Sequence, residues 1–308
     1  MTSIVEVKAD LTSDIFGKWA AFIEAKPRTV EAYTKTVRQF MKYLSERGIT
    51  RPTREDVIAF REHLKESHKA ATVQNYIMAV KQFFKWTAQA GIYPNIAEHV
   101  KGARIEKGFK KDYLTSKQVA KLIGAIDRTS PKGRRDYALL LLMVTTGLRT
   151  IEVARANVGD MRTLADFTAL YIQGKGRDDK EEYVKIEPPI EEAIRAYLKD
   201  RGGAKEDEPL FSSIAHRNGG ERMTTRSISR IVKEHLRGVD LDSDRLTAHS
   251  LRHTAATLNL LNGGTPEETR QLLRHTNINT TMIYSHALDR AKNRSEARIA
   301  AAILGAAG

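Results

Sequence analysis

Three stretches of the sequence carry arginine, histidine or tyrosine where helices are expected to begin or end. In the first, TTGLRTIEVAR (145–155), Gly147 should end one helix and Thr150 can cap the next, which places Arg149 at a helix N-terminus. Unpaired backbone N–H groups and the helix dipole favour an anion there, and the guanidinium adds to that preference. An arginine at such a boundary also commonly forms a surface ion pair, so both interpretations stay open.

The second stretch is TAHSLRHT (247–254), in which Thr247 can cap a helix. His249 and Arg252 are three residues apart and therefore share a helix face. The imidazole of His249, which exchanges protons near neutral pH, therefore lies beside the permanent charge of Arg252. A second histidine, His253, directly follows the arginine. A histidine on a helix is often structural, but this pairing raises the case for chemistry.

The third stretch is TPEETRQLLRHTNINTTMIYSH (265–286). Thr265 and Glu268 form a capping box around a first-turn proline, so a helix should start there and end near His275. A polar loop then leads to a short segment that bears Tyr284. A tyrosine near a helix end is more often a packing residue than a nucleophile.

A fourth motif is the turn QGKGR, in which Lys175 stands between two glycines. Glycine tolerates unusual backbone angles, so such a turn could swing the ammonium group toward a ligand. A solvated turn lysine is the alternative.

The elements that must position these residues divide into two predicted domains. Residues 1–100 contain four stretches with helical periodicity and no strand pattern, which predicts a four-helix bundle. Residues 113–308 are mixed: several helices surround one β-hairpin, formed by TALYIQG (168–174) and EEYVKI (181–186). The fold class is therefore mostly α with a small antiparallel β-sheet. A last short helix is expected over 289–304.

Between the domains, residues 101–112 (KGARIEKGFKKD) have five basic residues against two acids, as a solvated linker would. The overall balance is also basic: 51 Lys and Arg against 38 Asp and Glu give a net charge of +13. Such a balance favours polyanionic partners, although basic proteins without nucleic-acid partners exist. The exposed cations expected to touch DNA lie on predicted helices and in the linker: Lys81, Lys85, Lys101, Arg104, Lys107, Arg226 and Arg230.

Composition excludes several functional classes. The chain has no cysteine, which excludes disulfides and thiolate chemistry and fits a reducing compartment, the cytoplasm and its nucleoid. No P-loop, zinc-binding spacing or carboxylate triad occurs, so no cofactor or metal is expected. No apolar run is long enough to cross a membrane.

Taken together and in order, these motifs resemble the tyrosine recombinase, or phage integrase, family. That family's signature runs Arg, Lys, His-x-x-Arg, His or Trp, Tyr, with an acidic residue three positions after the first arginine. All are matched here in order, by Arg149, Glu152, Lys175, His249, Arg252, His275 and Tyr284. The resemblance extends over nearly the whole chain, with residues 10–100 similar to the core-binding domain and 113–308 to the catalytic domain.

The resemblance implies cleavage and rejoining of DNA strands through a 3′-phosphotyrosine on Tyr284. Arg149 and Arg252 would clamp the phosphate, Lys175 would protonate the leaving 5′-oxygen and His249 would assist proton transfer. His275 would hydrogen-bond the phosphate and Glu152 would support the site. The bond energy is kept in the covalent link, so neither metal nor nucleotide is required.

One position departs from the family pattern. Glycine commonly precedes the second histidine, whereas this chain has Arg274 there. The departure puts the local backbone geometry, or a DNA contact by Arg274, in question.

The expected partner is double-stranded DNA, bound by a homo-tetramer that spans two sites and exchanges C-terminal helices. The two-domain layout is similar to the Xer type, but mobile-element integrases share it, and a second recombinase or an accessory directionality factor stays open. Two rivals remain: a type IB topoisomerase-like enzyme without strand exchange, and a non-catalytic DNA-binding regulator.

Overall fold

The computed structural model describes residues 13–104, 112–174, 176–215, 218–293 and 295–305. The chain divides into two compact units, Met1–Gly108 and Phe109–Gly308. The predicted linker began at residue 101, but Ala103 is buried in the core of the first unit and the carbonyl of Lys101 accepts a 2.6 Å hydrogen bond from Arg61. Asp112, at the linker's other end, pairs with Arg245 of the second unit.

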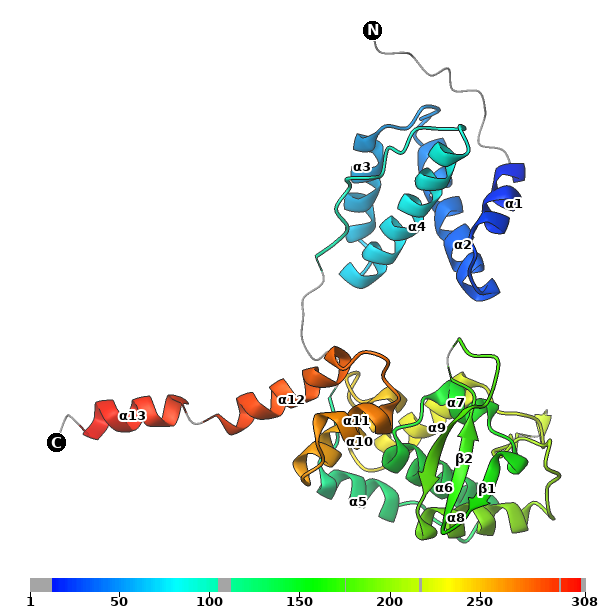
Figure 1. Ribbon diagram of the computed structural model, residues 1–308, viewed down its shortest axis with the longest axis vertical. Coiled ribbons are helices and arrows are strands. Elements are labelled where there is room, and N and C mark those ends of the chain that lie inside the picture. Colours follow the sequence, from blue (N-terminus) through cyan, green and yellow to red (C-terminus); the bar gives the residue numbers. More distant parts are fainter. Residues whose placement is uncertain (1–12, 105–111, 175, 216–217, 294, 306–308) are drawn as a thin grey trace. The chain divides into compact units, whose positions relative to one another are not determined.

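The first unit consists, over its described residues, of four helices: α1 (Ser13–Phe22), α2 (Pro27–Ser45), α3 (Arg54–Lys65) and α4 (Ala70–Gln89) (Figure 1). Aromatic side chains fill its core, and Trp19 meets Phe83 edge to face with ring centroids 5.2 Å apart. The backbone N–H of Thr53 donates to the Asp56 carboxylate at 2.7 Å, as the predicted start of α3 requires. The expected four-helix bundle is confirmed.

The second unit combines helices with a three-stranded antiparallel sheet in the order β1-β2-β3. Its first elements are α5 (Ser116–Gly124), α6 (Pro131–Thr146), α7 (Thr150–Arg155), η1 (Val158–Asp160), β1 (Met161–Leu164), β2 (Phe167–Ile172), β3 (Glu182–Ile186), α8 (Pro188–Asp200) and α9 (Thr225–Arg237). The fold class is confirmed, and β2 and β3 form the predicted hairpin.

Strand β1 was missed by the sequence reasoning. Leu164 pairs with Phe167, which leaves a two-residue turn of Ala165 and Asp166. Ala165 has a φ of 38°, a left-handed value usually supplied by glycine or asparagine in such turns. The four-residue strand also lacks apolar alternation, so neither the turn nor the strand carried its usual signal.

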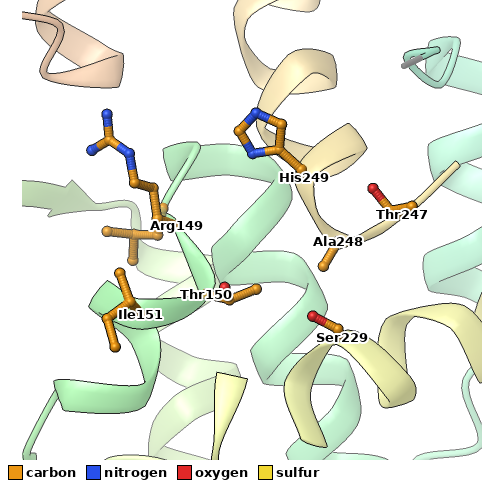
Figure 2. Close-up of a pocket in the computed structure, with 8 residues that line it drawn as sticks. Arg149, Thr150, Ile151, Ser229, Thr247, Ala248 and His249 are labelled. Atoms are coloured by element: carbon orange, nitrogen blue, oxygen red, sulfur yellow. The ribbon is translucent and has the colours of Figure 1, made fainter. Parts of the chain in front are cut away.

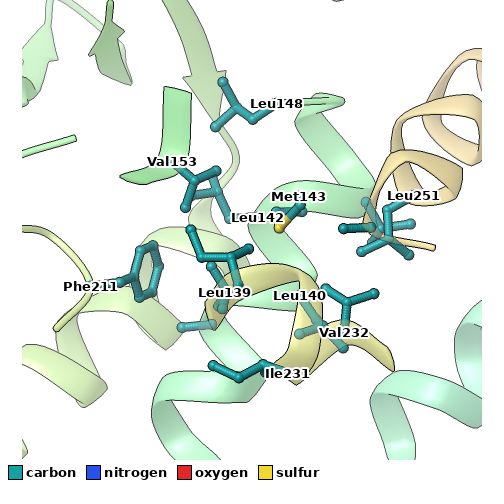
Figure 3. Packing of buried hydrophobic residues seen from close by; sticks show 14 of the residues in the cluster. Leu139, Leu140, Leu142, Met143, Leu148, Val153, Phe211, Ile231, Val232 and Leu251 are labelled. Atoms are coloured by element: carbon teal, nitrogen blue, oxygen red, sulfur yellow. The ribbon is translucent and has the colours of Figure 1, made fainter. Parts of the chain in front are cut away.

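Helix α6 is the centre of the second unit. Leu139, Leu140, Leu142 and Met143 are fully buried. They pack with side chains from α7, α9 and α10 (Ala248–Leu261), including Val153, Ile231 and Leu251 (Figure 3). This apolar centre fixes the C-terminal end of α6, where Gly147 takes a left-handed conformation with a φ of 62°. The end of α6 is therefore a rigid platform for the residues that follow it.

The remaining helices are α10 (Ala248–Leu261), α11 (Pro266–Leu273), α12 (Asn279–Lys292) and α13 (Ser295–Gly305). Tyr284 lies on a helix of 14 residues, not on a short segment, and this helix takes up the start of the expected tail helix. The break comes at Asn293, whose side chain accepts the backbone N–H of Ser295 at 2.8 Å and starts α13. Among the described residues, none of the helices is both long and apolar enough to cross a membrane.

Candidate active site

The first part of the site is the junction between α6 and α7. Arg149, rather than the expected Thr150, is the capping position of α7. The reason is Glu152, whose Oε2 accepts the backbone N–H of Arg149 at 2.8 Å while its Oε1 accepts the Arg149 guanidinium at 2.7 Å. Glu152 is fully buried, so the carboxylate fixes both the backbone and the side chain of the arginine.

Arg252 lies beneath this junction and is 2% exposed. One guanidinium nitrogen donates to the Gly147 carbonyl at 2.6 Å, and the other donates to the carbonyl of Leu273. These carbonyls stand at the C-terminal ends of α6 and α11, where unsatisfied carbonyl groups carry partial negative charge. Burial, together with the charges of Arg149 and Arg274, lowers the pKa of Arg252 to about 9.

Gly147 makes this arrangement sterically possible. A Cβ at this position would lie 2.7 Å from Leu273 Cδ2 and 3.4 Å from Ala255 Cβ. Glycine is therefore favoured here for two reasons: the backbone is left-handed, and α6 comes close to α10 and α11.

Tyr284 faces α10, and its hydroxyl lies 2.6 Å from Nδ1 of His253. Burial raises the pKa of Tyr284 to about 12 against the opposing charges of Arg252 and Arg149. Burial also lowers the pKa of His253 to about 4, with further contributions from His249 and Arg252. The pair is therefore a protonated tyrosine beside a neutral imidazole at neutral pH.

Sequence reasoning noted His253 only as a neighbour of the His-x-x-Arg motif. Its spacing carried the missing signal, because a residue four positions after His249 returns to the same helix face. The two imidazoles meet edge to face with ring centroids 4.6 Å apart. His249 is thus linked to Tyr284 through His253 in the described contacts.

His275 follows the end of α11 and is 9% exposed. Its Nδ1 lies 2.8 Å from the hydroxyl of Thr281 on α12. Burial, followed by the charges of Arg252, Arg149 and Arg274, lowers the pKa of His275 to about 4. The contact with Thr281 ties the loop after α11 to the helix that carries Tyr284.

A cavity of about 300 Å³ opens between the N-terminal ends of α7 and α10 and one residue of α9, Ser229. Arg149 and His249 line it from α7 and α10, and their side chains project toward the same side (Figure 2). The N-terminus of α10 and the Arg149 guanidinium around one hollow suit an anionic group such as a phosphate.

Arg274 also belongs to the site. It takes a left-handed conformation with φ 53° and ψ 47° directly after α11. Its guanidinium turns inward and donates to Glu152 Oε2 at 3.0 Å. The backbone at this position therefore keeps the conformation that favours glycine, although the residue is an arginine.

The contacts described above do not involve the other expected site residues. Lys175 and Lys107 lie outside the described residues. Lys81 is half-buried on α4, whereas Lys85, Lys101, Arg104, Arg226 and Arg230 are exposed, and Arg230 lies 3.5 Å from Glu234. Their role in DNA binding stays a prediction. Over the part of the chain that is described, no group of three or more His, Asp and Glu side chains is arranged to hold a metal ion.

The lowered pKa values of His253 and His275 predict a loss of stability in mild acid. In the unfolded chain each imidazole binds a proton near pH 6.5, whereas His253 and His275 resist protonation until about pH 4. The unfolded state therefore binds more protons in this window, and stability falls as the pH decreases through it. We expect the free energy of unfolding from urea titrations to fall by up to about 1 kcal/mol per pH unit for each histidine.

A matched pair of variants checks the origin of this effect. His275→Gln should reduce the pH dependence, whereas His99→Gln should leave it unchanged because the His99 side chain is 84% exposed. An equal pH dependence in wild type and His275→Gln would show that His275 does not resist protonation.

Comparisons with known proteins fit this geometry. Residues 112–291 match the phage integrase family, and residues 22–91 match its N-terminal SAM-like domain. The tyrosine recombinase XerC of Herpetosiphon aurantiacus is 32% identical over 84% of each chain. XerC of Caldanaerobacter subterraneus subsp. tengcongensis is 36% identical over 58% of this chain, and XerC of Chlamydia caviae is 32% identical over 66% of it. The match spans only 48% and 63% of the lengths of these last two relatives.

Solved structures give the same fold. The XerH site-specific recombinase bound to palindromic difH substrate covers 94% of this chain and 98% of its own, with a TM-score of 0.72 and 19% identity. A lambda integrase tetramer bound to a Holliday junction covers 90% of this chain and 78% of its own, with a TM-score of 0.68 and 17% identity. The family match extends over more than half of the chain and confirms the resemblance drawn from its motifs. This protein belongs to the phage integrase family, the tyrosine recombinases.

Proposed function

We propose that this protein is a site-specific recombinase that cuts and rejoins DNA through a covalent phosphotyrosine at Tyr284. The observation that carries the proposal is the position of the Tyr284 hydroxyl. It is buried, lies 2.6 Å from a neutral imidazole nitrogen of His253, and is subject to the charges of Arg252 and Arg149. A packing tyrosine needs neither a neutral base nor two arginines beside its hydroxyl.

In the proposed step the Tyr284 oxygen attacks the scissile phosphorus while its proton leaves to the histidine pair. The new bond joins the tyrosine oxygen to phosphorus, and the bond from phosphorus to the 5′-oxygen breaks. Lys175 gives the departing 5′-oxygen a proton, which yields a 3′-phosphotyrosine and a free 5′-hydroxyl. Religation runs the same step in reverse with a 5′-hydroxyl as the attacking group.

The arginines stabilise the charge that develops on the phosphate. Arg149 lines the cavity that can accept an anion, and Arg252 is held at the adjoining helix ends. A preorganised guanidinium in a site shielded from water stabilises a phosphorane-like state more than the same group in solution. His275 would add a hydrogen bond to the phosphate. This scheme stores the bond energy in the phosphotyrosine and draws on neither metal nor nucleotide.

The exposed apolar side chains of α13 support a proposed assembly on DNA. Ile299, Ile303 and Leu304 of α13 are 59%, 64% and 75% exposed. Three large apolar side chains on one terminal helix are typical of a surface that another chain covers. We place this helix on a neighbouring protomer of a homo-tetramer that joins two DNA sites.

The relatives leave integration, excision and chromosome dimer resolution open as the biological task, as well as the need for an accessory factor.

The test is covalent trapping on a nicked suicide substrate, after the cognate site has been found by selection. We expect a DNA adduct that survives denaturation and whose tryptic peptide carries the nucleotide on Tyr284. An adduct together with strand exchange between two duplexes separates a recombinase from a topoisomerase-like enzyme. No adduct on a site that the protein demonstrably binds would contradict the enzymatic proposal and favour a DNA-binding regulator.

A further inference from the structure

Arg274 occupies a backbone conformation that disfavours most side chains. Its φ of 53° lies in the left-handed region, where glycine is free of the steric penalty that a Cβ brings. The helix end of α11 would accept glycine without any change of backbone. A strained residue that persists at a functional site points to a role for its side chain.

The side chain itself is costly to hold. Only 7% of it is exposed, and one guanidinium nitrogen donates to Glu152 Oε2 at 3.0 Å while the other donates to the Leu272 carbonyl at 2.6 Å. Its Nε is buried and has no acceptor in the described part of the chain. A side chain with a strained backbone, a buried charge and an unsatisfied donor is not expected to stabilise the folded protein.

What the guanidinium changes is the charge around Glu152. That carboxylate is fully buried, and its nearest cations are Arg149 at 2.7 Å and Arg274 at 3.0 Å. With Arg149 alone, the full negative charge of Glu152 would oppose the cation that lines the phosphate cavity. With Arg274 present, the carboxylate shares its charge between two arginines, one on each oxygen.

We propose that Arg274 is the counter-ion of Glu152 and thereby leaves the positive charge of Arg149 available to the scissile phosphate. Arg274 is a positioning residue in this scheme, because its guanidinium is buried and acts through Glu152. The inference rests on the proposed function, since it assigns the anion of the cavity to the scissile phosphate. In this scheme Arg274 controls how strongly the negative charge of Glu152 opposes the positive charge of Arg149.

The experiment measures the single-turnover rate of adduct formation and the Kd for the same nicked DNA in three variants. Arg274→Gly removes the charge together with the backbone strain, Arg274→Gln removes the charge alone, and Arg274→Lys keeps a cation. We expect the first two to lower the cleavage rate by about 10- to 100-fold while the Kd changes by less than about threefold. Arg274→Lys should restore part of the rate.

A double-mutant cycle with Glu152→Gln tests the route of the effect. If Arg274 acts by compensating Glu152, removing the carboxylate charge should reduce the loss caused by Arg274→Gln to less than about threefold. Arg195→Gln is the matched control, because Arg195 pairs with Glu191 on the surface of α8, outside the site residues described above. It should change neither rate nor Kd.

Several outcomes would overturn the inference. Wild-type rates in Arg274→Gly and Arg274→Gln would show that the charge is not used, and an undiminished loss in the Glu152→Gln background would show that it does not act through that carboxylate. A parallel rise in Kd would make Arg274 a direct DNA contact. Each result requires an adduct with the wild-type protein, so its absence would instead remove the proposed function.

Discussion

Replacing Tyr284 with phenylalanine is expected to abolish the covalent adduct and to lower strand cleavage by at least about 10⁴-fold. The physical reason is that the variant lacks the oxygen that would bond to phosphorus in the proposed step. The measurement is the yield of denaturation-resistant adduct on the suicide substrate.

The same variant should remain folded and should bind DNA. Phenylalanine fills the same space against Ala256 and Leu273, and the lost contacts include the hydrogen bond to His253, which is worth about 1 kcal/mol. Tyr183→Phe is the matched control, because Tyr183 is 47% exposed on β3, and it should cleave at the wild-type rate. Adduct formation by Tyr284→Phe would assign the nucleophile to another residue.

The sequence was most informative where a local rule determines the geometry. Gly147 ends α6, Thr247 starts α10 and Thr265 starts α11, as glycine and capping residues predict. Arg149, His249 and His275 stand beside these helix ends, so the spacing of the ends also located part of the family signature. The hydrophobic periodicity of the N-terminal unit was sufficient for its four helices.

Other features depend on contacts between residues distant in sequence. The bond between His253 and Tyr284 joins positions 31 residues apart, and the Glu152–Arg274 pair joins positions 122 residues apart. No local pattern reports such pairs. Thr150 also looked like a better cap than Arg149, because a cap rule based on side-chain type does not foresee that Glu152 will bind the preceding backbone N–H.

Substituting Arg252 with lysine should lower the cleavage rate by about 10²- to 10³-fold, the second-largest effect expected in this site. Arg252 donates through two different nitrogens to the Gly147 and Leu273 carbonyls, and this planar fork fixes its charge between the ends of α6 and α11. An ammonium group keeps the charge but cannot span both carbonyls in the same way. One of the two helix ends would therefore lose its donor.

Stability should fall as well, and a second buried arginine separates the two effects. Arg135 is 4% exposed in α6 and bonds Asp136 and the Ser212 carbonyl, among residues that line no part of the cavity. Arg135→Lys should therefore lower the unfolding temperature without lowering the cleavage rate of the folded protein, whereas Arg252→Lys should lower both. Equal cleavage rates for the two folded variants would mean that Arg252 supports the helix ends and contributes nothing to the phosphate. A lower cleavage rate in Arg252→Lys but not in Arg135→Lys would mean that the two helix ends position the Arg252 guanidinium for the phosphate.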